Sequence, residues 1–175
     1  EDKIRETCMT DPESGFRMLV EKFQSPMYWH IRRMIISHDD AEDVLQETFI
    51  KIFRHLDDFR AEISLSTWIY RIATNECIRF LNRRKEEAIS TEEVQAELMN
   101  KLMASEYIDY DNAMEVKFQQ AILTLPEKQR LVFNLRYYDE LKYEEISRIT
   151  DTKVETLKAN YYFAKEKIKE YMTNN

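Results

Sequence analysis

The sequence of 175 residues contains one glycine, Gly15, and three prolines. Loops that cradle phosphates need several glycines, because only glycine lets the backbone approach a ligand that closely. A single glycine therefore argues against P-loop and dinucleotide-binding folds. So few helix breakers, together with many Leu, Glu, Lys, Arg and Met residues, predict an all-α protein.

Other features are also scarce. The two cysteines, Cys8 and Cys77, lie far apart, as is typical of free thiols in a reducing cytosol rather than of a disulfide scaffold or a zinc site. The three histidines are scattered, and no nucleophile–base pair or cluster of metal ligands is evident. We therefore expect no catalytic site, no metal and no cofactor. No run is long and apolar enough to span a bilayer, so we expect no direct membrane insertion.

The most informative stretch covers residues 64–85, SLSTWIYRIATNECIRFLNRRK. It contains no helix breaker, Ser66 can serve as its N-cap, and apolar residues recur at helical spacing from Trp68 onward. Five basic residues against one acidic residue give it a charge of +4, in a chain whose net charge is −7. Such a helix fits a nucleic-acid strand lying along it, and a core helix with a solvated basic face is the alternative. The polar residues that share one ridge are Arg71, Asn75, Arg79 and Arg83.

The segment before this helix predicts the rest of a first domain, residues 8–85. Helices are expected after Thr10 and, following a break at Ser25 and Pro26, again to about Ile36. Acidic residues open the next helix, DAEDVLQETFIKIFRHL, and basic residues close it, as the helix dipole prefers. A polar face beside its apolar stripe carries Asp43, Gln46, Glu47 and Ile50.

Residues 86–115 differ in composition, with nine acidic residues against Lys101 alone. This charge favours an acidic linker that is solvated or partly disordered. The alternative is a helix capped by Ser90, because a thin apolar stripe follows that residue. The stripe consists of Val94, Leu98 and Leu102.

Residues 116–175 predict a second domain. A capped helix starts near Thr124, and a short helix over 143–149, a tight turn over 150–153 and a long helix over 154–172 follow it. These are the parts of a helix-turn-helix, although a helical hairpin without function has the same pattern. The predicted fold is all-α, with two small helical domains joined by an acidic linker and a helix-turn-helix in the second.

Three motifs in this order resemble the bacterial RNA polymerase sigma factors of the extracytoplasmic-function (ECF) group. DAEDVLQETFIKIF is similar to region 2.2, STWIYRIATNECIRFLNRRK to regions 2.3 and 2.4, and LTLPEKQRLVFNLRYYDELKYEEISRIT with VETLK to region 4. The resemblance implies a cytoplasmic factor, not an enzyme, that recognises and melts promoter DNA. The partners it implies are core RNA polymerase, through the β′ clamp and the β flap, promoter DNA, and an anti-sigma factor.

The resemblance also implies residue roles. The residues expected to dock on polymerase are Asp43, Gln46, Glu47 and Ile50. The residues expected to bind the −10 element are Phe59, Arg60 and Glu62 in a base-capturing loop, and Trp68, Arg71, Asn75, Arg79 and Arg83 on the helix after it. The residues expected to bind the −35 element are Lys153, Glu155, Thr156, Lys158, Asn160, Tyr161 and Lys165.

Some positions depart from the family pattern. Asp151 replaces the usual turn glycine and can adopt the left-handed conformation, whereas Lys142 replaces the usual helix cap. Asn160 and Phe163 stand where basic residues are usual. The net charge of −7 favours a subunit that acts within polymerase over a stand-alone helix-turn-helix regulator, because such regulators are more often basic or dimeric. A helical enzyme or adaptor is a third option.

Overall fold

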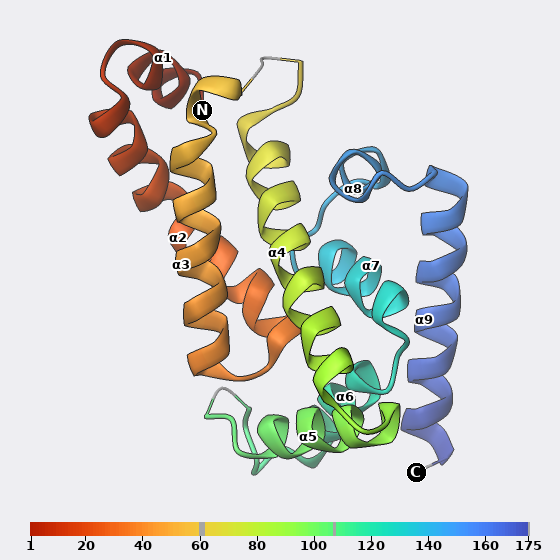
Figure 1. Ribbon diagram of the computed structural model, residues 1–175. Helices are drawn as coiled ribbons and strands as arrows, with labels where there is room; N and C mark the ends of the chain where they lie inside the picture. Colours follow the sequence, from red (N-terminus) through yellow and green to blue (C-terminus); the bar gives the residue numbers. More distant parts are fainter. Residues whose placement is uncertain (60–61, 107, 175) are drawn as a thin grey trace.

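The computed structural model describes residues 1–59, 62–106 and 108–174. Within these ranges every regular element is helical (Figure 1), which confirms the predicted all-α class. The elements are α1 (Asp2–Thr10), α2 (Pro12–Ile35), α3 (His38–Arg54), the 3-10 turn η1 (Leu56–Asp58), α4 (Leu65–Glu87), α5 (Thr91–Met103), α6 (Ala113–Leu123), α7 (Glu127–Tyr137), α8 (Tyr143–Thr150) and α9 (Val154–Asn174).

Helix α2 forms one side of the molecule with α3, and α1 folds back over its first turns (Figure 1). The predicted break at Pro26 is wrong, because α2 continues through this residue. Phe23, Met27 and Ile31 are buried on its inner face while Pro26 is exposed, so packing outweighs the lost hydrogen bond. Gly15 permits the fold-back of α1, since a Cβ there would come within 2.5 Å of the Cys8 backbone nitrogen.

Helix α4 runs through the middle of the molecule and contacts α2, α3, α5 and α8 (Figure 1). Its N-cap is Ser64 rather than the predicted Ser66, and the Ser64 hydroxyl accepts a hydrogen bond from the Thr67 backbone N–H at 3.0 Å. Ile69 and Ala73 on its apolar face are fully buried. The helix therefore presents a buried face and a polar face, as its sequence pattern predicts.

Helices α6 to α9 form the other side, with α7 packed on α9 and α8 above them (Figure 1). Asp151, between α8 and α9, has φ 52° and ψ 42°, which is the predicted left-handed conformation. The Glu145 carboxylate accepts a hydrogen bond from the Lys142 backbone N–H at 2.9 Å. Glu145 therefore supplies the capping contact that the Lys142 side chain cannot.

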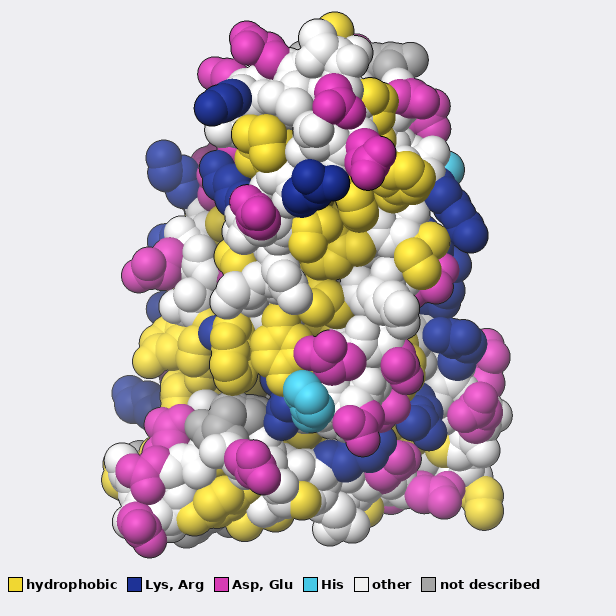
Figure 2. All heavy atoms as spheres, turned by 90° about the vertical axis from the view of Figure 1, so that its left-hand side faces the viewer, with side chains coloured by type: hydrophobic (Ala, Val, Ile, Leu, Met, Phe, Trp, Pro, Cys, Tyr) yellow, Lys and Arg dark blue, Asp and Glu magenta, His cyan; other side chains and the backbone are white. Residues whose placement is uncertain are grey.

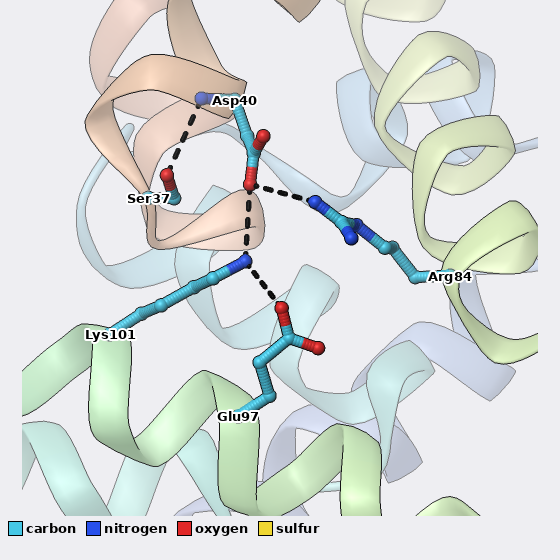
Figure 3. Close-up of polar contacts among 5 residues, drawn as sticks. All are labelled: Ser37, Asp40, Arg84, Glu97 and Lys101. Carbon is cyan, nitrogen blue, oxygen red and sulfur yellow. Dashed lines mark hydrogen bonds and ion pairs between the residues drawn. The ribbon is translucent and has the colours of Figure 1, made fainter. Parts of the chain in front are cut away.

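The acidic linker contains the Ser90-capped helix, which is the second of its two predicted forms. Leu102 of α5 is buried in a small cluster with Ile36 and Leu123. Lys101 lies between Asp40 at the start of α3 and Glu97, at 3.2 Å and 2.8 Å (Figure 3). These long-range contacts order a segment whose composition alone favours disorder.

One core joins both halves of the chain. Its buried residues include Met34 and Ile69 from the first half and Leu135 and Ile146 from the second. The division into residues 8–85, 86–115 and 116–175 stays a prediction, because the two halves share this core.

Candidate nucleic-acid and protein interfaces

A groove of about 700 Å³ lies between α2 and α3. The predicted docking residues Asp43, Gln46 and Ile50 line it, and Glu47 is exposed one turn along α3 from Asp43. Figure 2 shows this side of the molecule, where hydrophobic side chains gather between acidic and basic ones. The groove therefore combines an apolar floor with a charged rim.

The floor of this groove adds residues that the sequence prediction did not assign to docking. Phe53 is 53% exposed, and its ring lies 5.0 Å from that of Phe16 in α2. The available signal was the apolar run on α3, which is wider than one core-facing stripe needs. The added residues are Phe16, Val20, Phe49 and Phe53.

The predicted base-capturing loop begins at Phe59. The Phe59 ring packs on the Trp68 ring of α4 at 5.0 Å, and the Arg5 guanidinium of α1 lies 5.4 Å from its centre. Glu62 is exposed in the following turn, and Arg60 lies outside the described residues. An aromatic pair is thus held at the start of α4, where an unstacked base could bind.

The predicted ridge on α4 is present but not uniformly accessible. Asn75, Arg79 and Arg83 are exposed. Arg71 is engaged within the chain, because its guanidinium donates two hydrogen bonds to the Arg148 carbonyl oxygen of α8, one of them from Nε at 2.9 Å. Three ridge positions are therefore open to solvent, while Arg71 is held by the second half of the chain.

The predicted −35 residues lie along α9, except for Lys153, which directly precedes the helix. Lys153, Glu155, Thr156, Lys158 and Lys165 are exposed, and Asn160 is half-buried.

Tyr161 differs from the other residues assigned to this helix. Its ring packs inward, 6.0 Å from Phe133 and 6.3 Å from Tyr143, and burial raises the pKa of its hydroxyl. Phe163, which is 52% exposed, points outward although the prediction did not include it. The outward face of α9 therefore offers lysines and an aromatic ring, whereas Tyr161 supports the core.

A buried polar cluster joins the two halves around Asp139, which follows α7. The Tyr70 hydroxyl donates to Asp139 Oδ1 at 3.0 Å, the Arg33 guanidinium lies 3.8 Å from the same oxygen, and His30 Nδ1 lies 3.9 Å from Oδ2. Burial raises the pKa of Asp139 to about 6, with Arg33 opposing the shift. Burial also lowers the pKa of His30 to about 3 and raises that of Tyr70.

Two kinds of feature are absent from the described residues. No group of three or more His, Cys, Asp and Glu side chains could hold a metal ion in this part of the chain. No helix in the described ranges is long and apolar enough to cross a membrane.

Comparison with known proteins identifies the family. Residues 19–87 match Sigma-70 region 2, and residues 115–168 match Sigma-70 region 4. The chain is 30% identical over 168 residues to the ECF RNA polymerase sigma factor SigW of Bacillus subtilis (strain 168), covering 91% of this chain and 90% of that protein. It is 31% identical over 164 residues to the ECF RNA polymerase sigma-E factor of Escherichia coli (strain K12), covering 89% of this chain and 85% of that protein. The chain belongs to the sigma-70 family and, within it, to the ECF sigma factors.

Solved structures show the same fold. The sigma factor RpoE in complex with the anti-sigma factor NepR from Bartonella quintana has a TM-score of 0.70 and 20% identity, covering 91% of this chain and 98% of that one. CnrH in complex with the cytosolic domain of CnrY has a TM-score of 0.72 and 19% identity, covering 98% of this chain and 96% of CnrH. The arrangement of helices in this chain is therefore similar to that of RpoE and CnrH in these complexes.

Proposed function

We propose that this chain binds core RNA polymerase and directs it to promoters that carry −35 and −10 elements. The observation that carries the proposal is the order of three surfaces along one chain. The groove between α2 and α3 comes first, the Phe59 pair and the α4 ridge follow, and the helix-turn-helix comes last. Such a factor acts in the cytoplasm, where the polymerase is, and catalyses no reaction itself.

Polymerase docking uses the groove between α2 and α3. Its apolar floor can bury hydrophobic side chains of a partner helix, while Asp43 and Glu47 favour a basic partner. The coiled coil of the β′ clamp is the partner that the family relation suggests. Phe16 and Phe53 would contribute most of the buried area, because aromatic side chains bury the largest apolar surface.

Binding of the −10 element uses the start and the outer ridge of α4. The ridge guanidinium groups contact the phosphates of an opened strand, and an unstacked base packs beside Phe59 and Trp68. Binding captures the opened form and so favours melting of the duplex. Arg71 can join this surface only after it leaves the Arg148 carbonyl.

Binding of the −35 element uses the helix-turn-helix, with α9 in the major groove. Thr156 and Lys158 lie near the start of α9, where recognition helices usually contact base edges. Region 4 also reaches the β flap of polymerase. An anti-sigma factor is a further partner in this proposal, because the sigma factor RpoE, which has a similar fold, is seen in complex with the anti-sigma factor NepR.

The test is in vitro transcription with core polymerase from duplex templates that carry a randomised upstream region. Sequencing the transcripts should reveal enriched −35 and −10 elements that depend on the added chain. A stand-alone regulator would instead retain duplex DNA without polymerase and yield no transcripts from core enzyme. Absence of chain-dependent transcripts from the whole template pool would contradict the proposal.

A further inference from the structure

The two halves of the chain hold each other through polar contacts that cross the shared core. The Arg148 carbonyl of α8 holds Arg71 of α4, and the Arg130 guanidinium of α7 donates to the Met34 carbonyl of α2 at 3.3 Å. At the centre of this seam lies Asp139, whose side chain is 8% exposed. Side chains from α2 and α4 converge on it, so its carboxylate connects both helices of the first half to the second half.

This closed arrangement is incompatible with simultaneous binding of both promoter elements. Elements centred near −35 and −10 are separated by about 25 base pairs, or roughly 85 Å at about 3.4 Å per pair. Here α4 and α8 are in direct contact, and the Arg71 side chain is already bound to α8. The halves must separate before α4 and α9 can reach the two elements of one promoter.

We propose that Asp139 is a latch that holds the free chain closed and withholds Arg71 from DNA. The DNA part of this inference rests on the proposed function, whereas the latch itself is a property of the isolated chain. Opening breaks the hydrogen bond from Tyr70, parts Asp139 from Arg33 and frees Arg71 for a phosphate.

The chemistry around Asp139 makes this latch weak when the carboxyl group is ionised. Asp139 Oδ2 and His30 Nδ1 are both buried, and neither has a hydrogen-bond partner among the described residues. His30 is held neutral by burial and its other nitrogen lies 2.9 Å from the Thr74 hydroxyl, so it offers Asp139 no positive charge. A protonated Asp139 needs no such charge and still accepts from Tyr70. The neutral carboxyl group therefore suits the closed form better.

The direction of the pH effect follows from the titratable and charged groups around Asp139. These belong to His30 and Arg33 on α2, Tyr70 on α4, and Glu145 on α8, which lies near Tyr70. The pKa of Asp139 is about 6 in the closed form and about 3.9 when exposed, so protonation favours closure. The stabilisation of the closed form by protonated Asp139 is complete below about pH 4 and is lost as the pH rises through about 6. The contact of His30 with Thr74 lies within the first half and is not broken by opening, so we expect His30 to titrate similarly in both forms.

Two variants with opposite expected effects test the latch. Tyr70→Phe removes the hydroxyl that donates to Asp139 and should open the chain. Asp139→Asn keeps an acceptor for Tyr70 but cannot ionise, so it should favour the closed form at pH 7.5. A two-unit pKa difference corresponds to an increase of up to about 100-fold in the equilibrium constant for closing. A contact that is merely structural would be weakened by both changes.

The readout is energy transfer between dyes on Glu21→Cys of α2 and Glu170→Cys of α9, in a Cys8→Ser background. Both label sites are exposed. Transfer in the otherwise unchanged chain should fall as the pH rises from 5 to 8, with a midpoint near 6, whereas Asp139→Asn should give high transfer throughout. The matched controls are Tyr162→Phe and Asp111→Asn, both at exposed positions. Far-UV circular dichroism should show that every variant is folded.

Two results would overturn the latch. One is a shift of Tyr70→Phe and Asp139→Asn in the same direction at pH 7.5. The other is a pH profile that Asp139→Asn leaves unchanged. Since these measurements use the free chain, they can succeed even if transcription with core polymerase fails, and the two proposals are therefore separable.

Discussion

Glu47 is exposed on α3, one turn from Asp43 in the groove between α2 and α3. Glu47→Lys should weaken binding to core polymerase at least tenfold, because it places a positive charge against a basic partner. An exposed reversal usually changes the free energy of unfolding by less than about 0.5 kcal/mol, so the fold should persist. Titration of labelled chain with core polymerase measures the loss. Glu170→Lys on α9 is the control, and equal affinity of both variants would remove Glu47 from the docking surface.

Residue-scale predictions from sequence succeeded where the local pattern had one solution. Asp151 is left-handed as expected, because a tight turn between two helices requires that conformation and Asp tolerates it. The sequence pattern predicts the N-cap of α4 two residues too late, since Ser64 and Ser66 both suit the pattern. The inward position of Tyr161 was missed because it depends on Phe133 and Tyr143.

At the scale of the helices, α4 and α9 should have separate DNA functions. Arg79→Ala on α4 should impair open-complex formation more than duplex recruitment, because Arg79 is exposed on the ridge assigned to opened DNA. Lys158→Ala on α9 should instead weaken recruitment and lower its salt slope by about one unit. Comparison of a duplex promoter with one that carries a pre-opened −10 bubble separates these effects. The bubble should restore Arg79→Ala partly and leave Lys158→Ala defective, and equal rescue of both would reverse the assignment.

The linker helix α5 gives a second prediction at this scale. Lys101→Glu would place a negative charge against Asp40 and Glu97 (Figure 3). Loss of these partly exposed pairs and the new repulsion should lower the stability of α5 against the rest of the molecule by about 1 kcal/mol. We expect α5 to detach more often as a result. Limited proteolysis should then cut residues 88–112 faster than in the unchanged chain. Lys165→Glu on α9 is the control, and equal cleavage rates would show that Lys101 does not secure α5.

The existence of the helices can be predicted from sequence. Where a helix ends, and whether a segment is ordered at all, depends on contacts with residues distant in sequence. The apolar periodicity of α3 and α4 predicts both helices, because each must bury one face. The continuity of α2 through Pro26 cannot be predicted in this way, because it depends on buried neighbours on α2. The ordered state of α5 cannot be predicted either, because it depends on contacts with Asp40 and Leu123, which are distant in sequence.

At the scale of the whole molecule, the sequence predicts two domains, and in the structure the two halves of the chain share one core. Pairing of Tyr70 with Asp139 leaves no local pattern, since 69 residues separate the two. The order of regions 2 and 4 along the chain is nevertheless predictable from sequence, because each motif lies on one or two neighbouring helices. What could not be predicted is that Arg71, assigned to DNA, is also a contact between the halves.

The most direct test of the central claim is a footprint of a promoter obtained from the randomised templates, measured with and without core polymerase. The account predicts no protection by the chain alone, because its net charge of −7 disfavours binding to DNA outside polymerase. With core polymerase, it predicts protection of the −35 and −10 elements on the same molecule, with strand opening at −10. Protection of the duplex by the chain alone, or protection of only one element in the complex, would contradict the account.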